Sequence, residues 1–206
     1  QYVPVAAYQA GEVYFKREQF EKARERFATT VTFEGEKAET DIQAKGLIKL
    51  GQTNGMLGNW EKAKQYFQEF LDTYSEHKEA RRARFWLAKT YQNLKSYEKA
   101  LGEYQTVLKN GSEDELAPRA QFQIGECWFS LGDFDEAVTA FVKVTMKYDS
   151  PEWGAKAMLE MAIALDNKGQ RKESNQQLQE LIDKYPKRTE ATAARDLLEA
   201  REVPVK

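Results

Sequence analysis

The sequence has 206 residues, of which 31% are charged and 41% are hydrophobic, and its formal net charge is −2. Because the charges nearly balance, the chain as a whole is not expected to be attracted electrostatically to nucleic acid or to an anionic membrane. No apolar run approaches membrane-spanning length, and a single cysteine excludes an internal disulfide. The low content of glycine (12) and proline (5) favours an all-helical chain.

A small residue and an alanine or serine recur twelve positions apart along the chain. The five pairs are Gly11/Ala23, Gly51/Ala63, Ala88/Ala100, Gly125/Ala137 and Ala162/Ser174. The second members are 40 residues apart at the first step (63 − 23) and 37 at each later step (100 − 63, 137 − 100, 174 − 137). A fixed period of this length indicates a protein built of stacked structural repeats.

Each repeat has the pattern of two helices joined by a short polar break. An aromatic residue stands three positions before the second small residue in four repeats: Phe20, Trp60, Tyr97 and Phe134. Another large residue follows that small residue by four positions, which is one turn further along the same helical face. In the break, Asn59, Ser96 and Asp133 are side chains suited to cap the second helix. Each repeat is therefore predicted to be a helical hairpin, with its small residues where the two helices approach most closely.

In chain order, the period predicts repeats at about residues 4–36, 41–77, 78–114, 115–151 and 152–188. Residues 189–201 follow as one more amphipathic helix, which we expect to cover the apolar edge of the last repeat. The longer first step places additional residues near 34–40, and residues 203–206 are expected to form a loose tail. We expect a single domain over residues 1–206. Because the chain starts at Gln1 without a methionine, we interpret it as an excised segment or a processed form.

Two segments resemble a known repeat family. These are Leu87-Ala88-Lys89-Thr90-Tyr91 followed by Tyr97-Glu98-Lys99-Ala100, and Gly125 to Trp128 followed by Phe134-Asp135-Glu136-Ala137. They are similar to the tetratricopeptide repeat (TPR), which implies an all-α, right-handed α-solenoid of five TPR-like helical hairpins with a C-terminal capping helix. The period of 37 residues, with Tyr74, Tyr148 and Tyr185-Pro186 ending the second helices, resembles the BamD-like and YbgF/CpoB-like repeats of bacterial envelope proteins. That likeness implies a periplasmic or other bacterial envelope location, with the cytoplasm as the alternative.

The sequence lacks the residue patterns of common catalytic and cofactor sites. It has no G-x-S-x-G elbow and no G-x-x-x-x-G-K-[ST] phosphate loop, and one histidine with one cysteine cannot form a zinc cluster. His77 stands between Glu76 and Lys78, where we expect a solvated turn residue rather than a general base or ligand. Cys127 stands beside Trp128, where we expect a small buried thiol. We predict a protein that is not an enzyme, with no catalytic residue, no cofactor and no metal.

The resemblance also implies where a partner binds, because TPR proteins commonly hold a peptide or protein in the concave groove lined by their first helices. With the first small residue as position eight, position two is basic in four successive repeats: Lys45, Arg82, Arg119 and Lys156. Position five is apolar or aromatic in all five: Tyr8, Ile48, Phe85, Phe122 and Leu159. A ladder of cations beside an apolar strip suits a partner segment that is acidic and amphipathic. Phe85, Phe122 and the neighbouring Trp86 complete the predicted binding residues of a scaffold or adaptor, with bacterial envelope assembly as its setting.

Plainer interpretations of these residues stay open at this point. The cations can be solvated helix ends, and the apolar strip can pack against the neighbouring hairpin. The chain can also be a structural segment of a longer repeat protein or a self-associating homo-oligomer, which exposed Tyr2, Val3 and Val5 would favour. RNA binding is disfavoured by the acidic pI near 5.7, and membrane insertion is not expected. Tyr8 and Glu12 replace the lysine and asparagine by which chaperone-binding TPR proteins resemble one another, so no such clamp is expected.

Overall fold

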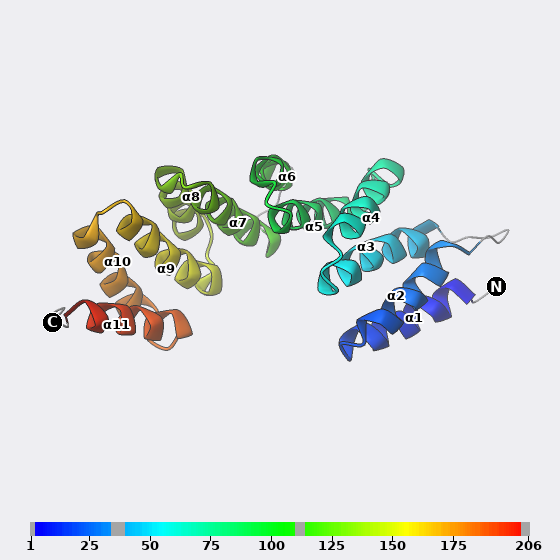
Figure 1. The fold of residues 1–206 in the computed structure, drawn as a ribbon, viewed down its shortest axis with the longest axis horizontal. Helices are drawn as coiled ribbons and strands as arrows, with labels where there is room; N and C mark the ends of the chain where they lie inside the picture. The colour runs from blue at the N-terminus through cyan, green and yellow to red at the C-terminus, as the bar shows by residue number, and fades with distance from the viewer. Residues whose placement is uncertain (1–2, 34–39, 110–113, 203–206) are drawn as a thin grey trace. The chain divides into compact units, whose positions relative to one another are not determined.

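The structure is a computed structural model that describes residues 3–33, 40–109 and 114–202. Within these residues it contains eleven helices and no strand (Figure 1). The helices are α1 (Val3–Lys16), α2 (Phe20–Val31), α3 (Thr40–Met56), α4 (Trp60–Thr73), α5 (Ala80–Asn93), α6 (Tyr97–Lys109), α7 (Leu116–Leu131), α8 (Phe134–Lys147), α9 (Pro151–Asn167), α10 (Arg171–Lys184) and α11 (Thr189–Glu202). The predicted all-helical fold class is confirmed. Tyr2, most of the predicted loop at 34–40 and the tail at 203–206 lie outside the described residues.

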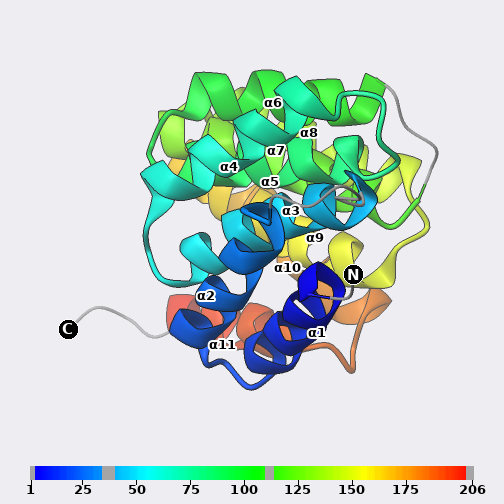
Figure 2. The same ribbon diagram turned by 90° about the vertical axis from the view of Figure 1, so that its right-hand side faces the viewer.

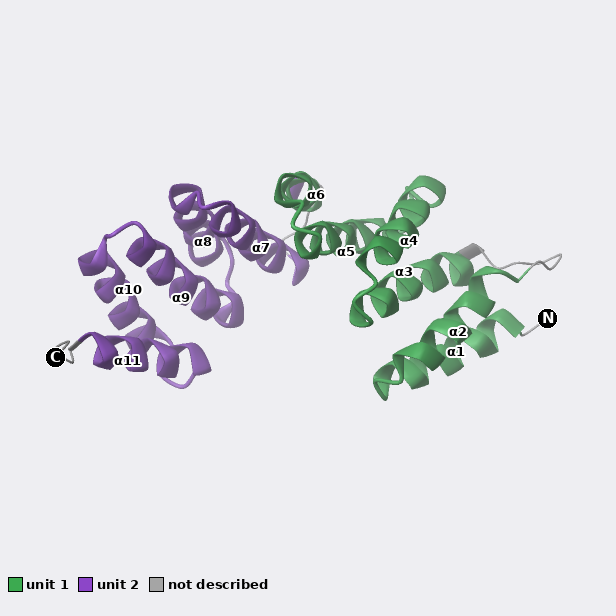
Figure 3. Ribbon diagram, viewed as in Figure 1, with its two compact units in different colours: residues 1–107 green, residues 108–206 purple. Residues whose placement is uncertain are grey.

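The helices form two compact units, residues 1–107 and 108–206 (Figure 3). In unit 1, α1 packs on α2 and α3 on α4, while contacts of α2 with α3 and of α4 with α5 join successive hairpins. The pair α1 and α2 lies side by side in Figures 1 and 2. In unit 2, α7 packs on α8, α8 on α9 and α9 on α10. Helix pairs of this kind are what the repeat pattern predicts, while the exact repeat bounds and a single domain over residues 1–206 stay predictions.

In three hairpins the predicted small residue of the first helix is a glycine that lies against an aromatic ring of the second helix. A Cβ atom added to Gly125 of α7 would lie 2.4 Å from the ring of Phe141 of α8, which is closer than real Cβ contacts come. The same relation holds in two other hairpins: Gly11 with Phe27, and Gly51 with Phe67. The ring of the second helix thus fills the space that the missing side chain leaves on the first helix.

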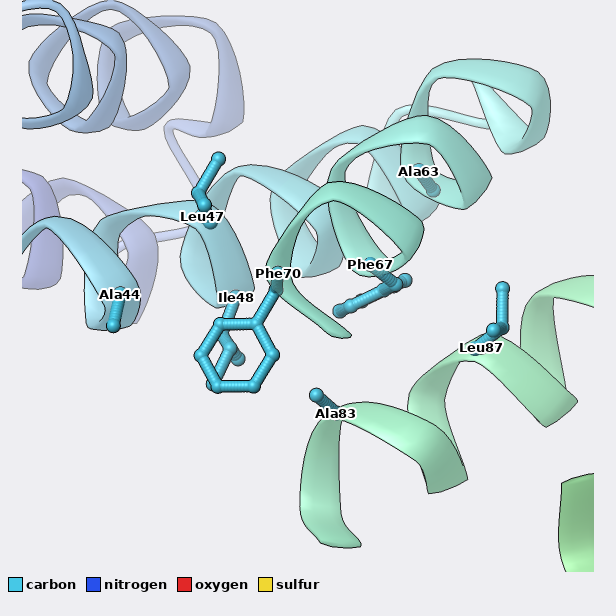
Figure 4. Packing of buried hydrophobic residues seen from close by; sticks show 8 residues of the cluster. All are labelled: Ala44, Leu47, Ile48, Ala63, Phe67, Phe70, Ala83 and Leu87. Carbon is cyan, nitrogen blue, oxygen red and sulfur yellow. The ribbon is translucent and has the colours of Figure 1, made fainter. Parts of the chain in front are cut away.

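The second helix α4 shares its aromatic residues between the first helices on either side of it. In unit 1, Phe67 and Phe70 of α4 are fully buried and form one cluster with residues of α3 and α5 (Figure 4). The other buried members are Ala44, Leu47, Ile48, Ala63, Ala83 and Leu87. Because α4 buries apolar surface against its own partner and against the next repeat, the core within the unit is continuous from hairpin to hairpin.

The predicted capping side chains in the hairpin turns are only partly confirmed. Asp133 Oδ1 accepts a hydrogen bond from the backbone N–H of Glu136 at 3.1 Å, as a helix cap requires. Asn59 makes no such bond, so the prediction is wrong there. The residue before Asp133 is Gly132, with φ 80°, and Lys95 adopts φ 57° at the equivalent place in the third hairpin. The turns therefore depend on a left-handed residue that ends the first helix as much as on a side-chain cap.

The last helix, α11, covers the end of unit 2 as predicted, and it ends one residue later than expected. It contacts both α9 and α10 and buries Ala191 and Ala194. The Arg201 guanidinium reaches back to Asp166 Oδ2 of α9 at 2.9 Å and to Ser174 Oγ of α10 at 3.2 Å. Among the residues that the structure describes, no helix is long and apolar enough to cross a membrane.

Candidate functional site

The first helices of neighbouring repeats contact one another within each unit. In unit 1, α3 contacts α1 and α5, and in unit 2, α9 contacts α7 and α11. These helices carry all the side chains predicted to bind a partner: Lys45 on α3, Arg82, Phe85 and Trp86 on α5, Arg119 and Phe122 on α7, and Lys156 on α9. The predicted ladder of cations is thus divided between the two units, and each half forms a surface of its own.

In unit 1, the first cation of the ladder belongs to an ionic cluster centred on Asp41. The Lys45 Nζ lies 2.5 Å from Asp41 Oδ2, while His77 Nε2 and Lys78 Nζ lie 3.0 and 3.9 Å from Oδ1. Hydrogen bonds from Lys45 and then from His77 hold the pKa of the Asp41 carboxyl below its usual range. The charge of Lys45 is therefore offset by Asp41, which lies one helical turn earlier on the same helix.

His77 has a structural role, in contacts between repeats, that its polar neighbours in the sequence do not indicate. Its side chain is only 16% exposed, whereas a solvated turn residue was predicted. The ring packs edge-on against Phe70, with centroids 5.7 Å apart, and Nδ1 accepts a hydrogen bond from the backbone N–H of Glu79 at 3.1 Å. His77 therefore joins α3 to the start of α5, and the prediction of a solvated side chain is wrong because contacts between repeats enclose it.

Carboxylates surround Tyr8 of α1 in the same unit. Burial, and then the charges of Glu12, Glu79 and Asp41, raise the pKa of the Tyr8 hydroxyl to about 12. Glu12 itself pairs with Lys49 of α3 at 2.5 Å, which joins the first helices of the first two repeats. The surface of unit 1 around Tyr8 thus carries both signs of charge rather than a cationic strip.

The remaining predicted residues of unit 1 differ in depth. Arg82 Nη1 lies 3.1 Å from Glu79 Oε2, so this cation too has an acidic neighbour on the same stretch of chain. Phe85 is 1% exposed and packs on Trp86, with ring centroids 5.9 Å apart. Trp86 is half-buried, and Lys89 Nζ lies 5.4 Å from its ring centroid. Phe85 is consequently buried beneath the surface residues, whereas Trp86 keeps part of its side chain accessible to a partner.

In unit 2, the structure brings two predicted cations together on one aromatic ring. Lys156 Nζ lies 4.4 Å, and the Arg119 guanidinium carbon 6.0 Å, from the ring centroid of Trp153. Trp153 is half-buried and packs on Phe122, with centroids 5.3 Å apart. Phe122 is 8% exposed, so it too lies beneath the surface residues. Sequence reasoning missed Trp153, although its place one helical turn before Lys156 was a usable signal.

A pocket of about 400 Å³ lies beside Trp153 within unit 2. Pro118, Tyr148 and Trp153 give its wall an apolar part. Its other lining residues are polar or charged: Asp114, Glu115, Lys147, Asp149, Ser150 and Glu152. The Glu152 carboxylate also accepts a hydrogen bond from Lys156 at 2.7 Å, which lowers its pKa. The site therefore offers an aromatic face, two cations and an acidic rim within one unit.

Comparison with known proteins assigns this arrangement to a family. A family model for the tetratricopeptide repeat-like domain matches residues 52–146, and one for the tetratricopeptide repeat matches residues 156–188. The chain is a tetratricopeptide repeat protein. No curated protein sequence matches this TPR protein.

Solved TPR structures share the fold at low sequence identity. MamA from Desulfovibrio magneticus RS-1, residues 41 to the end, is 16% identical with a TM-score of 0.72, over 87% of this chain and 93% of that chain. YrrB, described as a TPR protein with an unusual peptide-binding site, is 20% identical with a TM-score of 0.65, over 92% of this chain and 90% of that chain. The nearly identical TPR-like repeats of a putative kinesin light chain from Podosopora anserina are 16% identical with a TM-score of 0.72, over 88% of this chain and 94% of that chain. These likenesses support the fold alone.

Unit 2 of the TPR protein also carries two glutamates whose charge is poorly compensated. Burial, and then the charge of Glu160 of α9, raise the pKa of Glu126 of α7 to about 7. Burial likewise raises the pKa of Glu160. Glu126 follows the small residue Gly125 directly, on the helix that also carries Arg119. Among the described residues no group of three or more histidines, cysteines, aspartates and glutamates could hold a metal ion.

We expect Cys127 to be inert in the folded protein. Its side chain is fully buried, and burial followed by the charge of Glu126 raises the pKa of its thiol to about 12. Since the thiolate is the reactive form, iodoacetamide at pH 8 should leave native Cys127 unmodified but alkylate it quickly in denaturing urea. Whole-protein mass spectrometry measures both reactions, and equal rates with and without urea would contradict the expectation.

Proposed function

We propose that this TPR protein is a non-catalytic interaction scaffold that binds an amphipathic segment of a partner at Trp153. The observation that carries the proposal is the convergence of Arg119 and Lys156 on the half-buried Trp153 ring. Tryptophan and arginine are the residues most enriched where interfaces carry their binding energy. The description of YrrB as a peptide-binding TPR protein supports the same class of ligand for this fold.

The charges around Trp153 indicate which partner chemistry fits. Lys156 is paired with Glu152, but both side chains are substantially exposed, and such an ion pair contributes only about 0–1 kcal/mol. A carboxylate of the partner can therefore compete with Glu152 for Lys156 at little cost. An apolar side chain next to that carboxylate would enter the pocket beside Pro118, and a basic residue would face the acidic rim.

A selection experiment tests this proposal. Short random peptides displayed on phage are selected on the purified protein, and the affinities of the enriched peptides are then measured by calorimetry. We expect peptides that combine an acidic residue with a large apolar one. Trp153→Ala and the double variant Arg119→Glu with Lys156→Glu should each weaken binding by about tenfold or more.

The control for the selection is Lys172→Glu, a charge reversal at an exposed lysine of α10 that lies outside the site. It should bind as the wild type does, and circular dichroism must show the same helix content in all variants. Peptides that bind Trp153→Ala and wild type equally would overturn the proposal, because the site would then lie elsewhere on the molecule.

Two finer parts of the function are proposals that rest on the sequence. The acidic, amphipathic character of the partner rests on the basic residue at position two of four successive repeats. A location in the bacterial envelope rests on the period of 37 residues and its resemblance to envelope repeats. We place unit 1 residues Lys45, Arg82 and Trp86 on a second binding surface, with the same mixture of charge and aromatic area.

A further inference from the structure

A second pocket in unit 2 is lined by three methionines and shares no lining residue with the pocket beside Trp153. It has a volume of about 700 Å³, with Met158 and Met161 of α9 at its base. One wall comes from α8 and is formed by Val142, Thr145 and Met146. Met146 is 81% exposed, the largest value among the exposed large hydrophobic residues described. We call this pocket the methionine groove.

The opposite wall of the methionine groove is acidic. It comes from α10 and includes Glu180 and Asp183, with Gln177 and Lys184 beside them. Glu180 and Asp183 are exposed, and neither has an ion-pair partner among the described residues. Asp183 accepts a hydrogen bond from Gln179 at 2.9 Å, and Lys184 Nζ lies 5.4 Å from the centroid of the Tyr185 ring. An occupant that is apolar on one side and basic on the other would match both walls.

The first helix of unit 1 has an exposed face of this chemistry. Val3 and Val13 are 50% and 48% exposed, and Ala6 and Ala10 complete an i, i+3, i+7, i+10 stripe along α1. Lys16 ends α1, and Arg17 follows it, one turn after Val13. Neither basic residue has an ion-pair partner among the described residues.

We propose that α1 of one copy of the protein docks into the methionine groove of a second copy. Val13 and its stripe would pack on Met146 and Val142, and Lys16 and Arg17 would pair with Glu180 and Asp183. Flexible methionine side chains adapt readily to an apolar helix surface, which suits such a contact. The inference goes beyond the proposed function, since it uses neither Trp153 nor any residue that lines the pocket beside it.

The geometry of this contact determines how the copies assemble. Helix α1 and the methionine groove are different surfaces of the chain, so the contact is heterologous, and every oligomer that does not close into a ring keeps one free surface of each kind at its ends. Growth can therefore continue beyond a dimer, and it should increase with protein concentration. An isologous dimer would instead stop at two copies.

Complementation between two variants tests the proposal. Val13→Glu destroys the apolar stripe of α1, and Met146→Glu destroys the groove, both at exposed positions where folding should be retained. In sedimentation velocity, the wild type should exceed its monomer mass of 23.8 kDa as concentration rises, whereas each variant alone should stay monomeric. An equimolar mixture of the two should form a dimer of twice that mass and stop there, because each pair then has one intact stripe and one intact groove.

Charge exchange provides a second, independent readout of the same contact. Lys16→Glu with Arg17→Glu, and Glu180→Lys with Asp183→Lys, should each abolish association alone and restore it when the two variants are mixed. The control is Met56→Glu, at another exposed methionine outside both surfaces, and it should associate as the wild type does. A wild type that stays monomeric at every concentration would overturn the proposal. So would a Val13→Glu and Met146→Glu mixture that stays monomeric, or equal loss of association in Met56→Glu.

Discussion

Replacing Gly125 with alanine should lower the free energy of unfolding by about 1–3 kcal/mol, although alanine is the better helix former. The new Cβ atom would lie 2.4 Å from the ring of Phe141, a fully buried residue held between neighbouring helices. Neither the ring nor the helices can move apart without loss of packing elsewhere in unit 2. Urea unfolding followed by circular dichroism measures the change as a lower midpoint.

Two further variants separate close packing from helix propensity. Gly102 of α6 has nothing within 4 Å of an added Cβ, so Gly102→Ala should raise stability by up to about 1 kcal/mol. The last hairpin combines Ala162 with Leu178 at the equivalent positions, so adding Phe141→Leu should recover part of the loss caused by Gly125→Ala. If Gly125→Ala and Gly102→Ala shifted the midpoint in the same direction, steric crowding at the hairpin crossing would not be the controlling factor.

The second large effect is a pH-dependent stabilisation by Glu126→Gln. Folding raises the pKa of Glu126 from 4.5 to about 7, so between these values the folded state binds more protons than the unfolded state. Stability contributed by this group is therefore present below pH 4.5 and is lost as pH rises through 7. We expect the free energy of unfolding of Glu126→Gln to exceed that of the wild type by about 1–3 kcal/mol at pH 8 and by less than about 1 kcal/mol at pH 5.

Urea unfolding at both pH values measures this difference. The matched control is Glu69→Gln on α4, where an exposed glutamate is also changed to its amide. Its effect on the free energy of unfolding should be small and the same at pH 5 and pH 8. A gain for Glu126→Gln that did not depend on pH would show that the amide packs better, and that the buried charge is not the cause.

Local periodicity was sufficient for the secondary structure and the order of the repeats. The pairs of small residues and the aromatic residues around them place each helix, because a helical face has the same spacing wherever it occurs. The end of α11 differs from its prediction by one residue, and the roles of Asp133 and the small residues at the crossings follow from local chemistry. Asn59 shows the limit, since its turn is stabilised by backbone geometry rather than by its side chain.

The candidate binding site could be predicted only in part. The position-two cations were visible in the sequence, as were the carboxylates four residues before Lys45 and Lys156. The approach of His77 to Asp41 and of Arg119 to Trp153 was not visible, because it depends on helices that meet only in the fold. Phe85 and Phe122 share a position with other apolar residues, and only the packing of successive repeats shows that both are buried. The prediction therefore placed the candidate binding residues on the first helices without distinguishing surface residues from the buried residues beneath them.

What the sequence by itself determined is the architecture: hairpins of a fixed period, small residues at each crossing, and a family assignment to the tetratricopeptide repeats. What only the tertiary structure decided is the chemistry of the surfaces, namely two cations on Trp153, an enclosed His77 and a methionine groove beside Glu180 and Asp183. The physical reason is the range of the interactions. Helix periodicity acts over a few residues of one chain segment, whereas burial and charge pairing depend on residues from different helices that meet only when the repeats pack.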